Sequence, residues 1–312
     1  MMQPEKKGGR KKAVLAVILI WMFCLWVSAF LFHGSAKANW KKVFRFCGLG
    51  DFSDCADDSP FSLHVLDVGK ADSILAECSG HFLLIDGGTP DSGANVADYL
   101  KERNVKKIDL VINTHPDNDH IGGLKTVLQT FSVKRYLCPQ LPEKMVPKTQ
   151  EYQAVQSALK RRGLISEHPK SGTLFTVGLI KVEILGPVKQ GESTNDNSIV
   201  TRLTFGKTSF LLTGDAGFQE ENSIISSGID LKADVLKVGH HGSSTSTSQP
   251  FLEAVAPKYA VISVGNDSSK LPRVDVSQRL KTSGITVYRT DRNGTVIFLS
   301  DGKTVRVQTQ KS

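Results

Sequence analysis

The ten residues Thr114–Gly123, with the sequence Thr-His-Pro-Asp-Asn-Asp-His-Ile-Gly-Gly, constrain this chain more than any other stretch. They follow the largely apolar run Ile108–Ile112, which predicts a buried strand, and precede an amphipathic helix that begins near Leu124. One short loop therefore carries two imidazoles and two carboxylates: His115, Asp117, Asp119 and His120. Such groups bind divalent cations and would repel or stay protonated without one. The alternative is a polar loop that caps the helix, but a cap needs only one acceptor and explains neither the two histidines nor the paired glycines.

The charge of the chain is concentrated near its start. Half of the formal net charge of +8 comes from residues 1–12, where five basic side chains stand against Glu5. The rest of the 312 residues is only mildly basic, which agrees with a polyanionic substrate without requiring one.

An uncharged, mostly apolar run, Ala13–Phe32, follows this basic flank. It is long enough to cross a bilayer, which takes about 20 apolar residues, and the flank predicts a cytoplasmic N-terminus with the body outside the cell membrane. Cleavage near Ala38, followed by secretion, is the alternative to a single-pass anchor. We therefore divide the chain into a flank with its anchor or signal segment (1–38), a linker (39–60) and a folded body (61–312).

Strands and helices alternate along residues 61–312. Asp72–Cys78 and His81–Asp86 predict a hairpin, and Gln150–Arg162 predicts a helix that ends at a glycine. The stretch Asn195–Phe205 predicts a later strand. Because polar clusters stand at strand ends in both halves, we expect an α/β fold of two sheets packed face to face with helices outside.

The loop motif His-x-Asp-x-Asp-His-x-Gly-Gly resembles the metal motif of the metallo-β-lactamase superfamily, in the variant found in ComEC-type hydrolase domains of DNA-uptake channels. Further motifs of that family are matched in order along the chain: Leu66–Ser73, Leu84–Gly88, Asn195–Ser198, Leu212–Asp215 and Lys237–Ser243. The chain departs from the family pattern at Lys70 and Ala71, where Gln and Gly are usual, and at Leu271, where relatives often carry His. The resemblance implies an αββα sandwich with a metal site along the shared edge of its sheets.

The spacing within the loop suggests two divalent cations, zinc or manganese. His115 and Asp117 are expected to face one ion, and Asp119 and His120 the other, because the chain has turned into the helix between them. Asp119 is also the predicted catalytic residue, which would orient the attacking water or accept its proton.

The resemblance assigns further residues to this site. It implies that Asp215 bridges both ions and that His240 or His241 completes the second site. We favour His240, although the residues alone do not separate the pair. It also implies that Asp67 and Asp86 support the site without binding metal.

Four residues are candidate substrate contacts. Ser243 and Ser244, with Thr245, offer hydroxyl and backbone N–H groups to a phosphate, or else cap the helix that follows. Lys70 is either an anion contact or a solvated charge. Asn197 stands where most relatives carry a histidine, and its carbonyl is a poor ligand for zinc and a fair one for manganese.

The predicted function is a metal-dependent phosphodiesterase or nuclease that acts outside the membrane by metal-activated water. The resemblance favours DNA or another nucleic acid as substrate. The alternatives are a hydrolase of a cell-envelope phosphodiester of the teichoic-acid type and a non-catalytic, metal-containing envelope-binding module. The expected partners are the phosphodiester and, through the N-terminal segment, the membrane; no protein partner is inferred.

Overall fold

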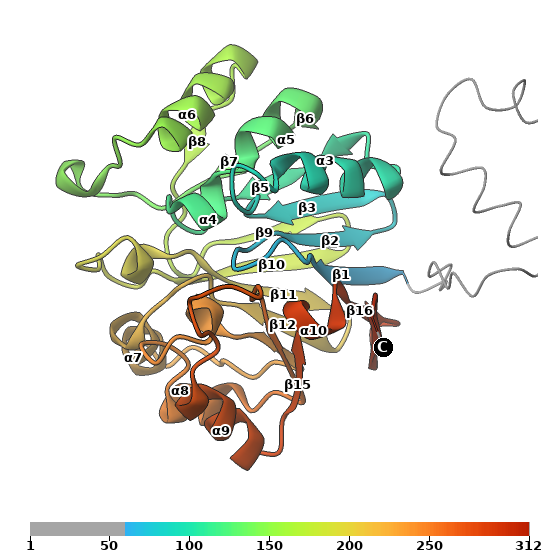
Figure 1. Cartoon of the computed structure of the whole chain (residues 1–312), viewed down its shortest axis with the longest axis vertical. Coiled ribbons are helices and arrows are strands. Elements are labelled where there is room, and N and C mark those ends of the chain that lie inside the picture. The colour runs from blue at the N-terminus through green and yellow to red at the C-terminus, as the bar shows by residue number, and fades with distance from the viewer. Residues whose placement is uncertain (1–59, 312) are drawn as a thin grey trace, which may run out of the picture. The chain divides into compact units, whose positions relative to one another are not determined.

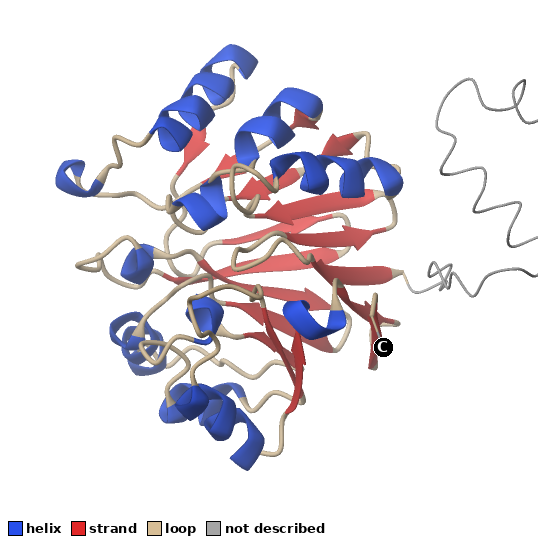
Figure 2. Ribbon diagram, in the orientation of Figure 1, coloured by secondary structure: helices blue, strands red, loops and turns tan. Residues whose placement is uncertain are grey.

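Two β-sheets pack face to face in the computed structural model, which describes residues 60–311, and helices cover both outer faces (Figure 1). Residues 60–311 belong to one compact unit. Figure 2 shows the same layers by secondary structure, with the strands enclosed between the helices. The α/β class expected from the sequence is confirmed for the described residues.

The first sheet has eight strands in the order β17-β16-β1-β2-β3-β5-β7-β8. Their bounds are β17 Val305–Thr309, β16 Val296–Ser300, β1 Phe61–Val65, β2 Ile74–Cys78, β3 His81–Ile85, β5 Leu110–Ile112, β7 Tyr136–Leu137 and β8 Ser166–Glu167. The second sheet has seven strands in the order β15-β14-β13-β12-β11-β10-β9. Their bounds are β15 Thr286–Arg289, β14 Tyr259–Ile262, β13 Val235–Lys237, β12 Thr208–Leu212, β11 Val200–Phe205, β10 Ile180–Gly186 and β9 Leu174–Val177.

The helices divide between the two outer faces. Apolar residues of three helices pack with the outward residues of the first sheet: α3 (Gly93–Glu102), α5 (Leu124–Thr130) and α6 (Gln150–Arg162). Three others pack in the same way on the second sheet: α7 (Phe218–Ser226), α8 (Gln249–Val255) and α9 (Val274–Thr282). The remaining elements are short: α4 Asn118–Ile121, α10 Thr290–Asn293, the pair β4 Lys107–Ile108 and β6 Ser132–Val133, and the 3₁₀ turns η1 Glu143–Met145, η2 Asn195–Asn197 and η3 Gly239–Gly242.

The core between the sheets follows from the alternation of side chains along each strand. In β3, Leu83 and Ile85 point into this core, whereas Leu84 faces the helices. Phe61 from the first sheet lies 4.8 Å, centroid to centroid, from Phe210 of the second. Burial of both faces of each sheet explains why the strands read as nearly continuous apolar runs.

Most predicted elements are present, and two differ from expectation. The helix Gln150–Arg162 has the predicted bounds, with Thr149 accepting a hydrogen bond from Tyr152 N and Gly163 in the left-handed conformation. The strand expected from Asn195 begins only at Val200, because residues 195–197 form a 3₁₀ turn. The run Ile108–Ile112 is split at Asp109, where the chain passes from β4 to β5.

The sheets bring the ends of several strands to one edge. Strands β3 and β5 are parallel, and so are β12, β13 and β14, so their carboxyl ends lie on the same side within each sheet. The polar motifs follow these ends directly. Among residues 60–311, no helix is long and apolar enough to cross a membrane, and the predicted span Ala13–Phe32 falls outside that range.

Candidate metal centre

The loop after β5 delivers the first group of side chains. His115 is fully buried, and Asp117 stands at the N-cap position of α4, whose single turn carries Asp119 and His120. The two glycines after this turn allow it to pack closely. A Cβ at Gly123 would collide with the carbonyl oxygen of Gly87, so only glycine lets the helix start lie against the turn that follows β3.

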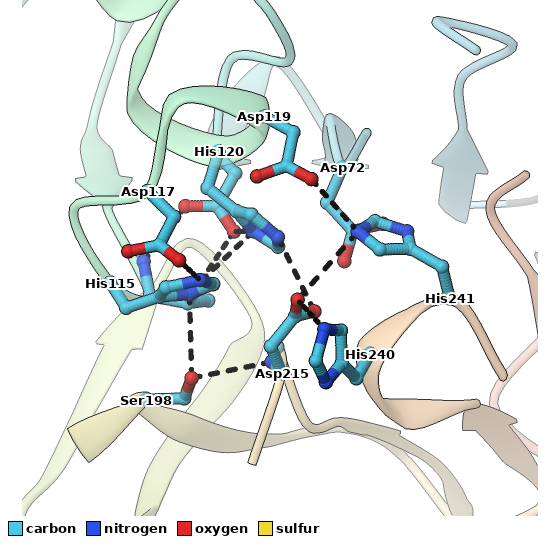
Figure 3. A network of polar contacts seen from close by, with 12 residues as sticks. Asp72, His115, Asp117, Asp119, His120, Ser198, Asp215, His240 and His241 are labelled. Carbon is cyan, nitrogen blue, oxygen red and sulfur yellow. Dashed lines mark hydrogen bonds and ion pairs between the residues drawn. The ribbon is translucent and has the colours of Figure 1, made fainter. Parts of the chain in front are cut away.

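Buried metal-binding atoms from four side chains converge on this loop, and none of them has a hydrogen-bond partner among the described residues (Figure 3). These buried atoms are the Nε2 atoms of His115, His120 and His241 and the Oδ1 atom of Asp215. Ligand atoms of His115, His120 and Asp215 lie within 4.8 Å of one another, as do those of Asp119, His120 and His241. Buried polar atoms are normally paired, and imidazole nitrogens with carboxylate oxygens form a suitable donor set for divalent cations. These residues therefore fit a metal centre.

Hydrogen bonds from the other ring nitrogens orient two of these imidazoles. His120 Nδ1 lies 2.8 Å from Asp86 Oδ2, and His241 Nδ1 lies 2.8 Å from the carbonyl oxygen of Ser263. Asp86 is held in turn by Thr114, whose backbone N–H and hydroxyl both donate to it. With Nδ1 donating, each Nε2 presents its lone pair to the cluster, which is the usual arrangement of metal-binding histidines.

Asp215 lies between the two groups of ligands. Its Oδ1 is 3.3 Å from His120 Nε2, and its Oδ2 is 3.6 Å and 3.7 Å from Nε2 of His240 and His241. Burial raises the pKa of this carboxyl, but the charges of His120 and His241 outweigh that effect and hold the pKa well below its usual value. An ionised carboxylate in this place can contact cations on both sides.

The geometry separates the two consecutive histidines, and it corrects the preference for His240. Both residues adopt left-handed backbone angles in η3, which sends their side chains in different directions. His241 is fully buried, and its Nε2 lies 3.6 Å from Asp119 Oδ2. His240 keeps 28% of its side chain exposed, and its Nδ1 lies 3.2 Å from the hydroxyl oxygen of Thr245. The position beside Asp119 therefore belongs to His241.

Lys70 is paired with the predicted catalytic residue. Its Nζ lies 2.7 Å from Asp119 Oδ2, and 31% of its side chain is exposed. For Asp119, the contact with His241, the charge of His120 and the hydrogen bond from Lys70 overcome the effect of burial and lower the pKa of the carboxyl. Asp119 is therefore ionised at neutral pH, and Lys70 is more than a solvated charge.

A buried ion pair beneath the centre was not anticipated. Asp72 Oδ2 lies 2.9 Å from Lys237 Nζ, and both side chains are almost fully buried. Asp72 N also donates to the carbonyl oxygen of Asp119, which links the pair to the metal loop. The available signal was Lys237 itself, a charge within the otherwise apolar strand β13, since a buried charge requires a partner.

Of the two carboxylates expected to support the site, the structure places only Asp86 beside it. Asp67 is exposed, and its Oδ2 lies 3.0 Å from Lys311 Nζ near the end of the chain. The expectation for Asp67 was therefore wrong. The carboxylate of the motif Leu66–Ser73 that supports the site is Asp72.

Asn197 is engaged by its own loop. Its amide nitrogen donates to the carbonyl oxygens of Gly191 and Ser193, and its Oδ1 accepts from Gly191 N. The neighbouring Ser198 reaches the centre instead, where its Oγ lies 3.4 Å from His115 Nδ1 and accepts from Asp215 N. Asn197 thus fixes the loop, and its role as a substrate contact stays a prediction.

The serines after the histidine pair do not cap the next helix. The N-cap of α8 is Ser248, which accepts from Phe251 N. Ser243 Oγ lies 3.0 Å from Thr245 Oγ1, and Ser244 donates to Asp275 at the start of α9. A phosphate contact through these hydroxyls stays a prediction, and Asp275 places a carboxylate close to Ser244.

Comparison with known proteins identifies the family. Residues 66–266 match the profile described as "Metallo-beta-lactamase superfamily". The chain belongs to this superfamily. Metallo-beta-lactamase folds are generally hydrolases and bind divalent metals, in agreement with the His and Asp clusters described above.

Its homologues are ComEC-type competence proteins. The chain is 31% identical to ComE operon protein 3 of Bacillus subtilis, over 75% of this chain and 32% of that protein. It is 28% identical to competence protein ComA of Neisseria gonorrhoeae, over 78% of this chain and 33% of that protein. The chain thus spans about a third of the length of these relatives. Among solved structures, CmlA, a diiron beta-hydroxylase from Streptomyces venezuelae, shares the metallo-beta-lactamase fold, with a TM-score of 0.50 and 14% identity over 80% of this chain and 54% of that one.

Proposed function

We propose that this metallo-beta-lactamase-fold protein is a metal-dependent phosphodiesterase that cleaves nucleic acid. The observation that carries the proposal is the convergence of buried ligand atoms, without hydrogen-bond partners among the described residues, on an ionised Asp119 that is paired with Lys70. Such a centre can bind cations and place a charged, orienting carboxylate beside them. Two-metal sites stabilise the attacking and leaving oxygens of an in-line displacement at a phosphoryl group.

Two ions would be held by overlapping sets of residues. The first set is His115, His120 and Asp215, with Asp117 beside His115, and the second is Asp119, His120 and His241, so His120 belongs to both.

When bound, divalent cations lower the pKa of water and neutralise charge on the phosphoryl group. Asp119, being ionised, accepts a hydrogen bond from the attacking water and sets its direction. Lys70 fixes Asp119 and adds positive charge for a phosphoryl oxygen. His240 is partly exposed; burial, with the charges of His241 and Lys70, lowers its pKa, so it meets the substrate as a neutral imidazole.

The relatives support nucleic acid as the substrate class. The name of the Neisseria gonorrhoeae relative concerns competence, and a further match, 32% identical over 76% of this chain, is recombination protein 2 of Haemophilus influenzae. DNA is therefore the substrate that we propose first.

The test uses the full chain with manganese or zinc and three substrates: bis(p-nitrophenyl) phosphate, single-stranded DNA and double-stranded DNA. Asp119→Asn should reduce DNA cleavage by about 10²- to 10⁴-fold, the usual contribution of a positioned acid–base group. Asp98→Asn, on the exposed face of α3, is the matched control and should be neutral.

Three outcomes decide the proposal. DNA cleavage that is lost in Asp119→Asn supports it. Hydrolysis of the small diester without DNA cleavage replaces it with an envelope phosphodiesterase of the teichoic-acid type. Metal binding without any turnover replaces it with a non-catalytic binding module.

We also propose that Ala13–Phe32 anchors the chain in the cell membrane with its catalytic body outside. The support is the basic flank before this apolar run. Resistance to alkaline extraction from membranes, together with digestion of the body by protease added outside spheroplasts, is the expected result. Release of a shortened chain into the medium would favour cleavage near Ala38.

A further inference from the structure

A pocket of about 330 Å³ lies beside the metal loop and takes no part in the metal centre. Its walls come from the loop after β5, from β7 and the segment after it, from β8, and from α6. The volume is at the lower end of the range of roughly 300–1,000 Å³ that is usual for small-molecule sites. It can therefore hold one ring system with its substituents.

The pocket and the metal centre share a wall. Pro116, which lines the pocket, lies between the ligand candidates His115 and Asp117. Asn113 also lines it and donates a hydrogen bond to the carbonyl oxygen of His115. A substrate whose phosphodiester lies at the metal centre can therefore place a neighbouring group in this pocket.

The lining describes the chemistry of that group. None of the described residues that line the pocket is Asp, Glu, Lys or Arg, so the lining offers no permanent charge to pair with a charged occupant. The ring of Tyr152 provides flat apolar surface, and the amides of Gln140 and Gln156 provide donors and acceptors. This combination suits a planar, neutral heterocycle, which stacks on aromatic rings and pairs its edge with amides.

Tyr136 adds a second, independent indication of a ligand. Its side chain is fully buried, and its hydroxyl has no hydrogen-bond partner among the described residues. Burial raises the pKa of this phenol well above its usual value, so the hydroxyl remains a donor at any physiological pH. An unpaired buried hydroxyl is costly unless an occupant of the pocket satisfies it.

We propose that this pocket binds a nucleobase next to the cleaved phosphodiester. The inference rests on the proposed function and deepens it, because it names the part of the substrate that is recognised. A base can enter only after it leaves the stack of a duplex, so single strands or frayed ends should be preferred over intact duplexes. A polyol phosphate has no flat ring for these surfaces.

Binding without turnover tests the pocket directly. The probes are a fluorescent single-stranded oligonucleotide and a matched oligonucleotide of the same length in which the bases are replaced by abasic sites. Anisotropy is measured with the full chain in EDTA, so that no cleavage occurs. The base-containing strand should bind about tenfold more tightly, since stacking contributes an effect of about this size for each base.

Two variants locate the effect. Gln156→Ala, which removes one of the amides that would pair with the edge of the base, should reduce the difference between the two probes. Gln150→Ala, an exposed glutamine on the same helix that does not line the pocket, should leave it intact. Circular dichroism establishes that both variants are folded.

The outcomes separate this proposal from the proposed function. Equal binding of both probes by the unmodified chain contradicts the proposed base-binding pocket, and so does a difference that is undiminished in Gln156→Ala. Cleavage assays with manganese report on the function alone. Cleavage of both probes at equal rates would support the proposed nuclease activity and contradict the proposed base-binding pocket.

Discussion

His240 and His241 follow one another in the chain, but their ring nitrogens make different contacts. His241 uses Nδ1 to donate to the carbonyl oxygen of Ser263 and directs Nε2 toward Asp119, whereas His240 is partly exposed beside Thr245. What distinguishes them is the partner of the second ring nitrogen, which fixes the orientation of the first. No feature of the local sequence encodes that partner.

The first prediction compares alanine variants of this pair. His241→Ala should weaken binding of the more tightly held ion by at least about 100-fold, because a direct ligand is lost. His240→Ala should change it by less than about tenfold and act mainly on KM. Calorimetric titration with manganese gives the affinities. Equal losses in the two variants would return His240 to the ligand set.

The second prediction concerns Asp86, which acts on the metal through His120. Asp86→Asn keeps the volume but removes the charge that holds His120 Nδ1, so metal affinity should fall about 10- to 100-fold. Asp67→Asn is the matched control, because Asp67 pairs with Lys311 away from the centre. Thermal melts without metal separate a loss of affinity from a loss of folding. A loss in Asp67→Asn as large as that in Asp86→Asn would contradict the assignment.

At the scale of elements, α7 stabilises the segment that carries the second half of the site. Glu221 accepts hydrogen bonds from the backbone of Thr247 and Ser248, just beyond the histidine pair. Glu220 accepts from Val188 N and holds the chain after β10. Both carboxyls are buried, so this helix is tied by acidic side chains where apolar ones would be usual.

The third prediction follows from the pKa of Glu220. Burial, with a contribution from the charge of Asp196, raises this pKa from 4.5 to about 7, although Val188 N opposes the shift. Between these values the folded state keeps a proton that the unfolded chain has released, so the free energy of unfolding falls as pH rises. The fall is at most about 3 kcal/mol.

Denaturant unfolding between pH 4.5 and pH 8 checks this prediction. Glu220→Gln, which keeps an acceptor for Val188 and cannot ionise, should lack that part of the pH dependence. Glu253→Gln, on the exposed side of α8, is the control and should retain it. An unchanged pH dependence in Glu220→Gln would assign the effect to another group.

At the scale of the whole unit, the metal centre joins the two sheets. His115 and His120 follow β5 of the first sheet, and Asp215 and His241 follow β12 and β13 of the second. A cation held by both groups cross-links segments about a hundred residues apart in the chain. Metal binding should therefore stabilise the fold as well as enable catalysis.

The fourth prediction measures that coupling. Manganese or zinc at 100 times its dissociation constant stabilises the folded state by about 2.7 kcal/mol. For a unit of this size, that corresponds to a rise in Tm of roughly 5–10 °C relative to the protein in EDTA. The double variant Asp119→Ala/His241→Ala should show little rise. An equal rise in the double variant would mean that the ion binds elsewhere.

The sequence by itself determined the α/β class and most of the candidate ligands. It did so because His115, Asp117, Asp119 and His120 share one loop, and local chain geometry alone brings them together. The apolar strands before each polar motif could also be predicted from the sequence, since a strand that is buried on both faces is a continuous apolar run. Periodicity and capping also gave the bounds of α6.

Only the tertiary structure decided the contacts between distant segments. Lys70 meets Asp119, Asp72 meets Lys237, and Asp67 turns away to Lys311. The pocket beside Pro116 likewise depends on how β7, β8 and α6 meet. Each of these contacts depends on the packing of whole sheets, which fixes the position of a side chain through neighbours that are remote in the chain. Spacing along the sequence carries no information about such neighbours.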